Sequence, residues 1–508
     1  MKLTKGFLNR EPRKTALSFV VSLTLMVLAG VMSGCNDNPG VPVTGAEKAA
    51  DDEQSETASA CAFYKGENIV VVTYNDGTDH DPTVTYGPNS RKVIAGASLM
   101  GWSYSKNKGQ SWTYGGKVSP PNGWAVLWGD PAITDDNGAY QYVFMSNLAI
   151  PNSKMPANGI DGSVIVSGAD SYIGGACIAR SADGGVTFQN YQCVSNTVKN
   201  SVPNSDKGHF YDGGSMASSN AGEIFAAFVD VTTSQIDVWR SPSASGQFAM
   251  LPPPFPGIGI CSHPRLRVRR ADGALYVAAQ ACNNSVAFIN RYINGSWGQP
   301  VAATDSGVIY PNVAFGGGLT LRTGPQFSFD VGAASNENQS DAIRFLYTRR
   351  DSKSGRLFVT GSFCPASLSP GCWGAPEWGT TPGNLNTPGD QFNPNVAAWP
   401  GFIGIDPAWK SSFLDRDGSV QNAVTLRQGN LAYLPNGNRI YLPFIVLGDK
   451  PVCPDTRGYW GDYGDLALVG FENNIAQFLV TTSDSSLGCD RRWDFDSHNQ
   501  HIRGVVFQ

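Results

Sequence analysis

The sequence predicts an all-β protein built from repeated antiparallel sheets, and two observations on the whole chain indicate it. Gly (58 residues), Pro (32) and aromatic residues (11%) are frequent, whereas charged residues make up only 16% of the 508 residues. This composition suits pleated strands joined by tight turns, and the long Ala/Leu/Glu/Lys stretches that helices need are missing. Short apolar runs separated by turn residues also recur along most of the chain. A chain of this length can bury a substantial core.

The first 34 residues are expected to be a signal peptide. The basic residues near the start are Lys2, Lys5, Arg10, Arg13 and Lys14. They precede the apolar run ALSFVVSLTLMVLAGVMSG (16–34), and this order is typical of an export signal rather than of a spanning helix. The run ends in MSGC (32–35), which resembles the lipobox of bacterial lipoproteins with Met32 in place of the commoner Leu. The resemblance implies Cys35 as the lipidated first residue; a plain secretory signal is the alternative.

Residues 35–60 are expected to form a disordered acidic tether. Segment 36–60 carries six acidic residues and one Lys, with almost no bulky apolar residues. Asn36 directly follows the lipobox cysteine, which for a lipoprotein implies no retention in the inner membrane. We therefore expect a lipid-anchored protein of the bacterial cell envelope, at the outer membrane or cell surface. The net charge of -5 argues against a nucleic-acid partner.

A coarse repeat organises the rest of the chain. Each unit has a short strand, a turn with Gly, a second apolar strand, and a third strand that runs into a polar loop; alternation and turn residues are those of antiparallel hairpins. Six such units are expected, at roughly 60–118, 125–200, 205–255, 258–305, 320–375 and 455–508. Residues 376–452 interrupt the pattern, and we expect an insertion there. Closing the units into a ring would remove most exposed sheet edges.

Two polar segments, SKNKGQSW (105–112) and SADGGVTF (181–188), follow third strands with the same spacing. They resemble SxDxGxTW, the Asp-box or BNR repeat of sialidase-like β-propellers. The matching residues are Ser105, Asn107, Gly109, Ser111, Trp112, Ser181, Asp183, Gly185, Thr187 and Phe188. The Asp or Asn side chain can accept backbone N–H bonds in a tight turn, Gly supplies a conformation barred to other residues, and the ring enters the apolar layer. We expect these turns to build the fold and to have no catalytic role.

The resemblance implies a six-bladed, sialidase-like β-propeller over residues 61–508, after the signal peptide and the tether. Ligands of such propellers meet the mouth of the central channel, where the innermost strands begin. The candidate ligand-binding residues at these starts are Trp128, Asp130, Asp212, His263, Arg265, Asp462 and Tyr463. Aromatic, acidic and basic side chains together suit a polar, sugar-like ligand. The alternative is that these residues cap strands and link neighbouring blades.

Three functions remain open from the sequence. The first is binding of a glycan or a protein at the cell surface. The second is an exo-acting glycoside hydrolase of the sialidase type, for which the resemblance implies three arginines, a Tyr nucleophile with a Glu, and an Asp acid. Tyr463, Arg265 and Asp130 are the candidates, but no Arg stands at the start of the first unit and no Glu partner is evident. The third is an assembly or structural factor of the envelope.

Disulfides are expected, because an exported protein folds in an oxidising compartment. Cys177 and Cys193 flank SADGGVTF, and Cys261 and Cys282 flank a hairpin turn at ADG, so each pair is placed face to face. Three assignments are left with less support: a short loop closed by Cys364 and Cys372, a pairing of Cys453 with Cys489, and an odd Cys61.

No cofactor is expected. The segment DRDGS places Asp415 and Asp417 at alternate positions, as oxygen-ligand loops for calcium do, but a solvated turn is the alternative. The five histidines show no zinc-ligand spacing.

Overall fold

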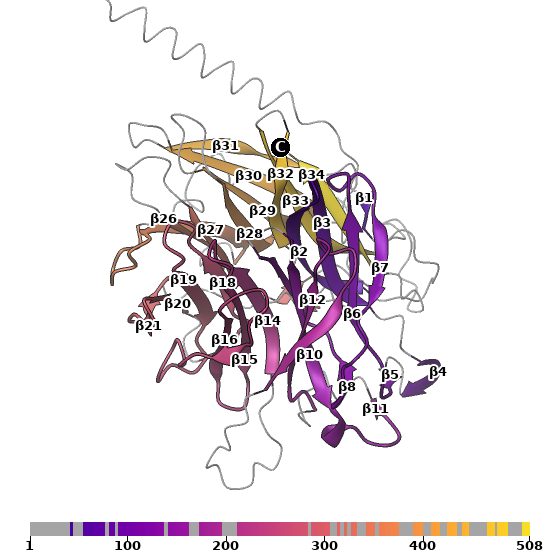
Figure 1. Cartoon of the computed structure of the whole chain (residues 1–508). Coiled ribbons are helices and arrows are strands. Elements are labelled where there is room, and N and C mark those ends of the chain that lie inside the picture. The colour runs from indigo at the N-terminus through magenta and orange to yellow at the C-terminus, as the bar shows by residue number, and fades with distance from the viewer. Residues whose placement is uncertain are drawn as a thin grey trace, which may run out of the picture.

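The computed structural model describes residues 41–43, 54–76, 81–86, 90–136, 141–161, 172–195, 211–282, 286–304, 312–314, 320–322, 327–332, 342–350, 355–374, 390–399, 408–416, 424–433, 439–446, 465–472, 475–485 and 500–507. Within these ranges the chain is all-β apart from one short 3-10 turn, η2 (Asn152–Lys154). None of the residues in them forms a helix with the length and apolarity needed to cross a bilayer. Antiparallel sheets stand side by side and fan out around the molecule (Figure 1).

Five consecutive sheets, called blades 1 to 5 here, are described with most of their side chains. Blade 1 contains β2 (Gln54–Tyr64), β3 (Glu67–Asp76), β6 (Met100–Ser105) and β7 (Thr113–Lys117). Blade 2 contains β8 (Trp124–Leu127), β9 (Ala132–Asp135), β10 (Val143–Pro151), β12 (Gly175–Ser181) and β13 (Gln189–Val194). Blade 3 contains β14 (Tyr211–Ser218), β15 (Ile224–Asp230), β16 (Gln235–Ser241) and β17 (Ala249–Met250). Blade 4 contains β18 (Arg265–Val268), β19 (Leu275–Gln280), β20 (Ala287–Ile293), β21 (Ser296–Trp297) and β22 (Val301–Ala302). Blade 5 contains β25 (Phe327–Gly332), β26 (Ala342–Arg350) and β27 (Leu357–Pro365).

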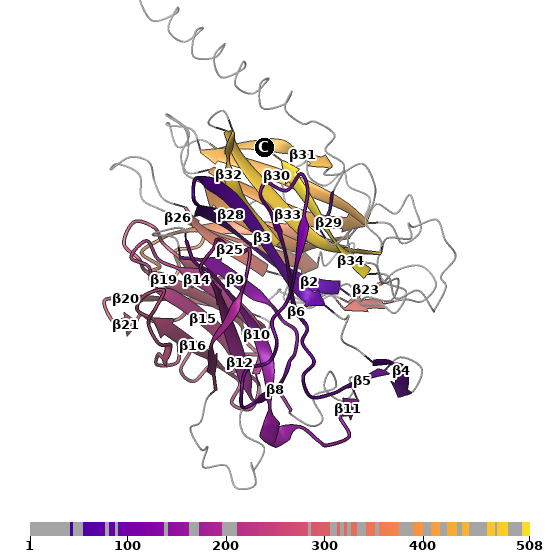
Figure 2. The ribbon, with the colours of Figure 1, turned by 45° about the vertical axis from the view of Figure 1, so that its right-hand side comes forward.

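Two further four-stranded sheets follow, described mainly by their backbone. The first contains β28 (Gln391–Trp399), β29 (Ala408–Arg416), β30 (Val424–Tyr433) and β31 (Arg439–Val446). The second contains β32 (Asp465–Glu472), β33 (Ile475–Ser485), β34 (Gln500–Phe507) and β1 (Val41–Pro42). Smaller sheets are formed by β4 (Asp81–Tyr86), β5 (Ser90–Val93) and β11 (Ile160–Asp161), and by β23 (Asn312–Ala314) and β24 (Thr320–Arg322). The sheet of β4, β5 and β11 lies apart from the blades at the lower right of Figure 2.

The chain is a β-propeller, but the expected count of six blades is wrong. Residues 376–452, which the sequence analysis set aside as an insertion, contain the sheet β28–β31. Its innermost strand β28 contacts β25 on one side and β32 on the other, so it occupies a place in the ring. This sheet escaped the repeat count because β30 and β31 are joined across LPNGN (434–438) rather than by a loop with the polar spacing of the other units.

The ring closes by pairing segments from the two ends of the chain. The innermost strands contact one another in the order β2, β9, β14, β18, β25, β28 and β32, and β32 returns to β2. Strand β1 pairs with β34, with Val41 opposite Gly504. This pairing covers an edge that β34 would otherwise expose. Residues 35–60 were expected to be a disordered tether, but β1 and the first residues of β2 lie within this range and form strands.

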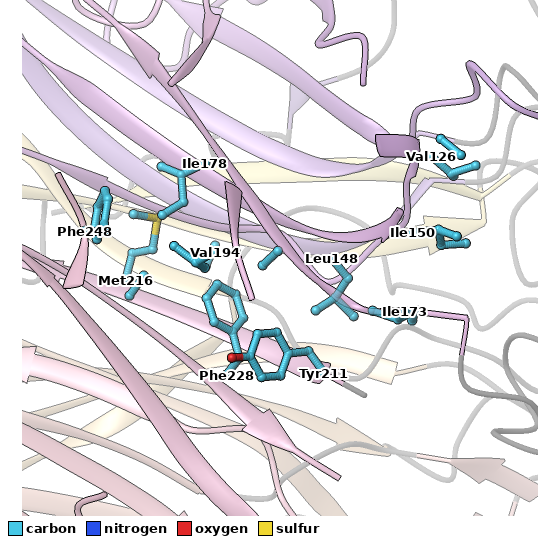
Figure 3. Packing of buried hydrophobic residues seen from close by; sticks show 14 of the residues in the cluster. Val126, Leu148, Ile150, Ile173, Ile178, Val194, Tyr211, Met216, Phe228 and Phe248 are labelled. Atoms are coloured by element: carbon cyan, nitrogen blue, oxygen red, sulfur yellow. The ribbon is translucent and has the colours of Figure 1, made fainter. Parts of the chain in front are cut away.

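Apolar side chains are buried between neighbouring blades rather than in a single centre. Figure 3 shows the cluster between blades 2 and 3, where Ile178 and Met216 lie side by side and Leu148 lies near two rings. Those rings, Tyr211 and Phe228, are stacked with centroids 5.5 Å apart. Because each blade is covered on both faces, the strand IFAAFVD of β15 is buried at every residue instead of alternating. Each large apolar side chain buried in this way contributes about 1.5–3 kcal/mol.

In the polar turn between β12 and β13 the Asp183 side chain accepts a backbone hydrogen bond, as expected, and Ser181 adds further bonds. The hydroxyl of Ser181 donates to Oδ1 of Asp183 (2.7 Å) and accepts from the N–H of Gly185 (2.7 Å). Asp183 also accepts from the backbone N–H (2.9 Å) and the hydroxyl (2.8 Å) of Thr187. Burial raises the pKa of Asp183, but the hydrogen bonds from Thr187 and Ser181 outweigh it, so the net pKa lies below the usual value. The ring of Phe188 then meets Trp102 of blade 1 edge-on at 5.2 Å.

The turn between β6 and β7 repeats this geometry with an amide. Ser105 donates to Oδ1 of Asn107 (2.8 Å) and accepts from the N–H of Gly109 (2.8 Å). The N–H of Ser111 donates to the same Oδ1 at 2.9 Å. Trp112 packs in the apolar cluster between blade 1 and the sheet of β32–β34. Both turns therefore join third and fourth strands and anchor a ring in an interface, as the sequence analysis predicted.

The two disulfides argued from hairpin geometry are confirmed. Cys177 and Cys193 lie opposite each other on β12 and β13, and Cys261 is bonded to Cys282 in blade 4. The short loop is also closed, by Cys364–Cys372. Cys61 takes part in none of these bonds; burial, assisted by the charge of Asp135, raises the pKa of its thiol to about 12. A raised pKa lowers the fraction of thiolate, which is the reactive form of cysteine. Cys35, Cys453 and Cys489 lie outside the described residues.

Candidate binding site at the channel mouth

Three of the predicted ligand-binding residues converge at the ends where innermost strands begin. Asp130 of blade 2, Asp212 of blade 3 and His263 of blade 4 each offer one ligand atom, and these atoms lie within 4.8 Å of one another. Nε2 of His263 is 3.6 Å from Oδ1 of Asp212. The imidazole is only 8% exposed, whereas the Asp212 side chain is 41% exposed. A buried ring therefore lies beside a carboxylate that a solute can reach.

Asp130 reaches the cluster because the innermost strand of blade 2 is broken there. Strands β8 and β9 both pair with β10, and the segment WGDP (128–131) separates them. Gly129 and Asp130 both have positive φ, 65° and 54°, which is unusual for a residue with a side chain. The N–H of Trp128 donates to the carbonyl of Leu148 (2.6 Å), and the N–H of Leu148 donates to the carbonyl of Gly129 (3.0 Å). These bonds hold the kink against β10.

Gly213 links the three blades. It lies at a register shift between β14 and β15, with φ of 56°, and its N–H donates to Oδ2 of Asp130 at 2.9 Å. A Cβ placed on Gly213 would be 2.2 Å from Cγ of His263, so the imidazole occupies the space that a side chain would need. Only glycine meets both requirements. Gly213, the third residue of YDGG, thus contacts Asp130 on one side and His263 on the other.

His263 is held by backbone contacts near the Cys261–Cys282 disulfide. The N–H of Cys261 donates to the carbonyl of Gln280 at 3.0 Å, and the N–H of Gln280 donates to Oγ of Ser262 at 2.7 Å. This segment enters β18 with little freedom, because covalent and hydrogen bonds tie it to the end of β19. The backbone that leads into His263 is therefore tied to blade 4.

The remaining predicted residues have different surroundings. Trp128 is partly buried and packs against the apolar cluster between blades 2 and 3. Arg265 is half-buried and opens β18, two residues after His263. Asp462 and Tyr463 lie outside the described residues, as do Asp417 and the side chain of Asp415.

Tyr211 and Glu223 do not form the Tyr–Glu pair of a sialidase. Tyr211, next to Asp212, is fully buried, and burial together with its hydrogen bond to Asp237 (2.7 Å) raises the pKa of its phenol. The ring therefore stays protonated and packed. Glu223 precedes β15 at the other end of β14, where it forms an ion pair with Arg240.

Asp330, an acidic residue of the innermost strand β25, was not among the predicted site residues. Asp330 of β25 accepts hydrogen bonds from the N–H of Ala398 on β28 (2.6 Å) and of Val331 (2.8 Å). Nε of Arg267 on β18 is 3.5 Å from its Oδ1. Burial raises the pKa of Asp330, and Arg267 opposes that shift. The contacts join three sheets, so we assign Asp330 to the ring's structure; one carboxylate within the apolar strand FSFDVG was the available signal.

No family model and no curated protein matches the chain. Solved structures of similar fold include a protein of unknown function from Dyadobacter fermentans (10% identity over 94% of this chain and 99% of that one, TM-score 0.45). The Hadza microbial sialidase Hz136 is 14% identical over 74% of this chain and 65% of its own, with a TM-score of 0.43. The intramolecular trans-sialidase of Ruminococcus gnavus is 11% identical over 93% of this chain and 97% of its own, with a TM-score of 0.41. Similarity at this level carries no functional assignment.

Proposed function

We propose that this protein is an exported, lipid-anchored β-propeller that binds carbohydrate at the mouth of its channel. The observation that carries the proposal is the convergence of Asp130, Asp212 and His263 from three blades within 4.8 Å. Residues far apart in the chain meet there at a solvent-accessible end of the ring, where propeller loops commonly bind ligands.

The chemistry of the cluster suits a polyhydroxylated ligand. Two carboxylates accept hydrogen bonds from neighbouring hydroxyls, and an imidazole can donate or accept. A hydrogen bond to an ionised group contributes about 1.5–3 kcal/mol, so two or three of them give useful affinity for a sugar. The Asp212 side chain is 41% exposed, so it is placed to make the first of these contacts.

Binding is tested on a glycan array with the wild-type protein and the Asp212→Asn variant. We expect a defined set of glycans to bind, with affinity lowered at least about tenfold by the substitution, since one charge-assisted hydrogen bond is lost. The matched control is Asp272→Asn. Asp272 lies in the turn at the other end of β18, where it pairs with Arg269 at 3.1 Å. The Asp272→Asn variant should therefore bind glycans as the wild type does.

The same preparation separates the other functions. Turnover of a fluorogenic sialoside would favour the hydrolase, with Tyr463→Phe as its test. A uniformly blank array without turnover would overturn the carbohydrate proposal and favour a protein partner or an assembly role. Lipid anchoring is tested separately, by labelling cells with palmitate and comparing the wild type with Cys35→Ser; absence of label in the wild type would contradict it.

A further inference from the structure

The geometry points to a divalent-cation site at the channel mouth. Asp130, Asp212 and His263 bind one first-row transition ion, Zn²⁺ or Mn²⁺, whose remaining positions take hydroxyl oxygens of the sugar. The inference deepens the proposed function and rests on it for the identity of the ligand. Binding of the ion itself is a separate property of these three side chains.

The separations of the donor atoms fit a shared ion. Two ligands about 2.1 Å from a tetrahedral ion are about 3.4 Å apart, and no pair of ligands can be farther apart than about 4.2 Å. The measured 3.6 Å between Nε2 of His263 and Oδ1 of Asp212 is close to the first value and longer than an ordinary N–H···O bond. All three ligand atoms lie within 4.8 Å of one another, so any pair reaches the tetrahedral separation if each of its two atoms shifts by at most about 0.7 Å.

The imidazole distinguishes this group from an ordinary acidic cluster. His263 is 93% buried, and its Nε2 is directed at the carboxylate of Asp212. The ring cannot swing away easily, because it lies against the Cα of Gly213 and follows the disulfide-tied segment at Cys261. A nitrogen donor held in place beside two carboxylates is a mixed donor set that acidic surface patches lack.

The hydrogen bond from the N–H of Gly213 orients the Asp130 carboxylate and still leaves that carboxylate lone pairs with which to bind an ion. The N–H donates to Oδ2 at 2.9 Å, and an ionised carboxylate has about four lone-pair sites. Bonds of this kind orient metal-ligating carboxylates, and their loss typically weakens metal binding 10–100-fold.

The donor set favours a first-row transition ion over Ca²⁺ or Mg²⁺. One nitrogen and two oxygens suit Zn²⁺ or Mn²⁺, whereas Ca²⁺ prefers six to eight oxygens. Three protein ligands leave at least one position open, as in sites that bind a substrate or water rather than in closed structural sites. The open side is that of Asp212, so a ligand would approach over this carboxylate.

The test measures metal binding without any sugar. The full mature protein is stripped with EDTA and titrated with ZnCl₂, MnCl₂ and CaCl₂ by calorimetry, with the bound ion counted by mass spectrometry after dialysis. We expect one ion per chain and weaker binding of calcium. His263→Gln and Asp212→Asn should each weaken Zn²⁺ binding at least about tenfold, and Asp272→Asn should leave it unchanged. No bound ion, or affinity that the two variants do not alter, overturns the inference.

Folding and function are kept apart in the same design. If His263→Gln fails to fold, Asp212→Asn decides, because the Asp212 side chain is exposed enough to be replaced without repacking. Glycan binding is then measured in EDTA and after Zn²⁺ is restored. Glycan binding that persists in EDTA would overturn the role of the ion in glycan binding and leave the proposed function intact. If an ion binds but the glycan array stays blank, the proposed carbohydrate binding is overturned and the metal site stands.

Discussion

The outer turn at Ser181–Phe188 and the channel mouth use the same materials in different ways. Both combine a short acidic side chain with glycine at positive φ and a donated backbone N–H. In the outer turn every hydrogen bond of Asp183 stays within one loop. At the mouth, Asp130, Gly213 and His263 belong to three blades. The turn can therefore form as soon as its hairpin forms, whereas the mouth exists only when the blades have packed.

The largest effect is expected from Gly213→Ala, which attacks the mouth directly. The new methyl would lie 2.2 Å from Cγ of His263, and the φ of 56° disfavours any side chain. Overpacking and strain together should cost about 2–5 kcal/mol of stability. Displacement of the imidazole should also weaken ligand binding at least about tenfold. Chemical denaturation and ligand titration measure the two effects.

Gly222→Ala is the matched control for this change. Gly222 also has positive φ, 80°, but nothing lies within 4 Å of a Cβ placed there. The Gly222→Ala variant should lose only about 1–2 kcal/mol of stability through backbone strain and should bind the ligand as the wild type does. Equal losses of binding in the two variants would show that the contact between Gly213 and His263 does not position the site.

The next largest loss of stability is expected when either of the two hairpin disulfides is removed. Replacing both cysteines by serine should cost about 2–4 kcal/mol at either Cys261–Cys282 or Cys177–Cys193, since each closes a loop of moderate length. Only the first pair borders the His263 segment, so only its loss should also weaken binding. Denaturation and binding are measured for both double variants. If removal of Cys177–Cys193 weakened binding equally, the two regions would not be independent.

A smaller effect is expected from Asp183→Ala in the outer turn. The substitution removes the acceptor for Ser181 and Thr187, and because Asp183 is partly exposed the loss should be about 1 kcal/mol. Ligand binding should not change. Asn107→Ala in the β6–β7 turn serves as a second example of the same loss. A drop in binding would contradict the purely structural role of these turns.

The smallest effect is the pH dependence of the Asp183 turn. Its hydrogen bonds lower the pKa of Asp183 below the unfolded value, which is about 3.9. The stabilisation is therefore fully present above that unfolded value and is lost as the pH falls through the lower folded one. Asp183→Asn, which copies the amide of Asn107, cannot titrate. The difference in Tm between wild type and variant should be constant near neutral pH and change only in acid; a change centred near neutrality would assign it to another group.

Local signals predicted much of the fold, because strands, turns and hairpin disulfides depend on nearby residues. The spacing of Ser181, Asp183 and Gly185 was enough to predict a tight turn in which Asp183 accepts a backbone hydrogen bond. The starts of innermost strands pointed to Asp130, Asp212 and His263. The number of blades could not be obtained in this way, since β28–β31 carries no polar turn of the counted type. Asp330 was missed because its partners on β18 and β28 are distant in sequence.

By itself, the sequence determined that this protein is made of antiparallel hairpins, where their polar turns lie, and which cysteines pair across them. Each of these properties is settled by residues close together along the chain. Only the tertiary structure decided that β1 joins β34, that β28 takes a place in the ring, and that one imidazole and two carboxylates meet above Gly213. Those contacts depend on how blades pack against one another, and that packing is set by the shapes of buried side chains throughout the ring.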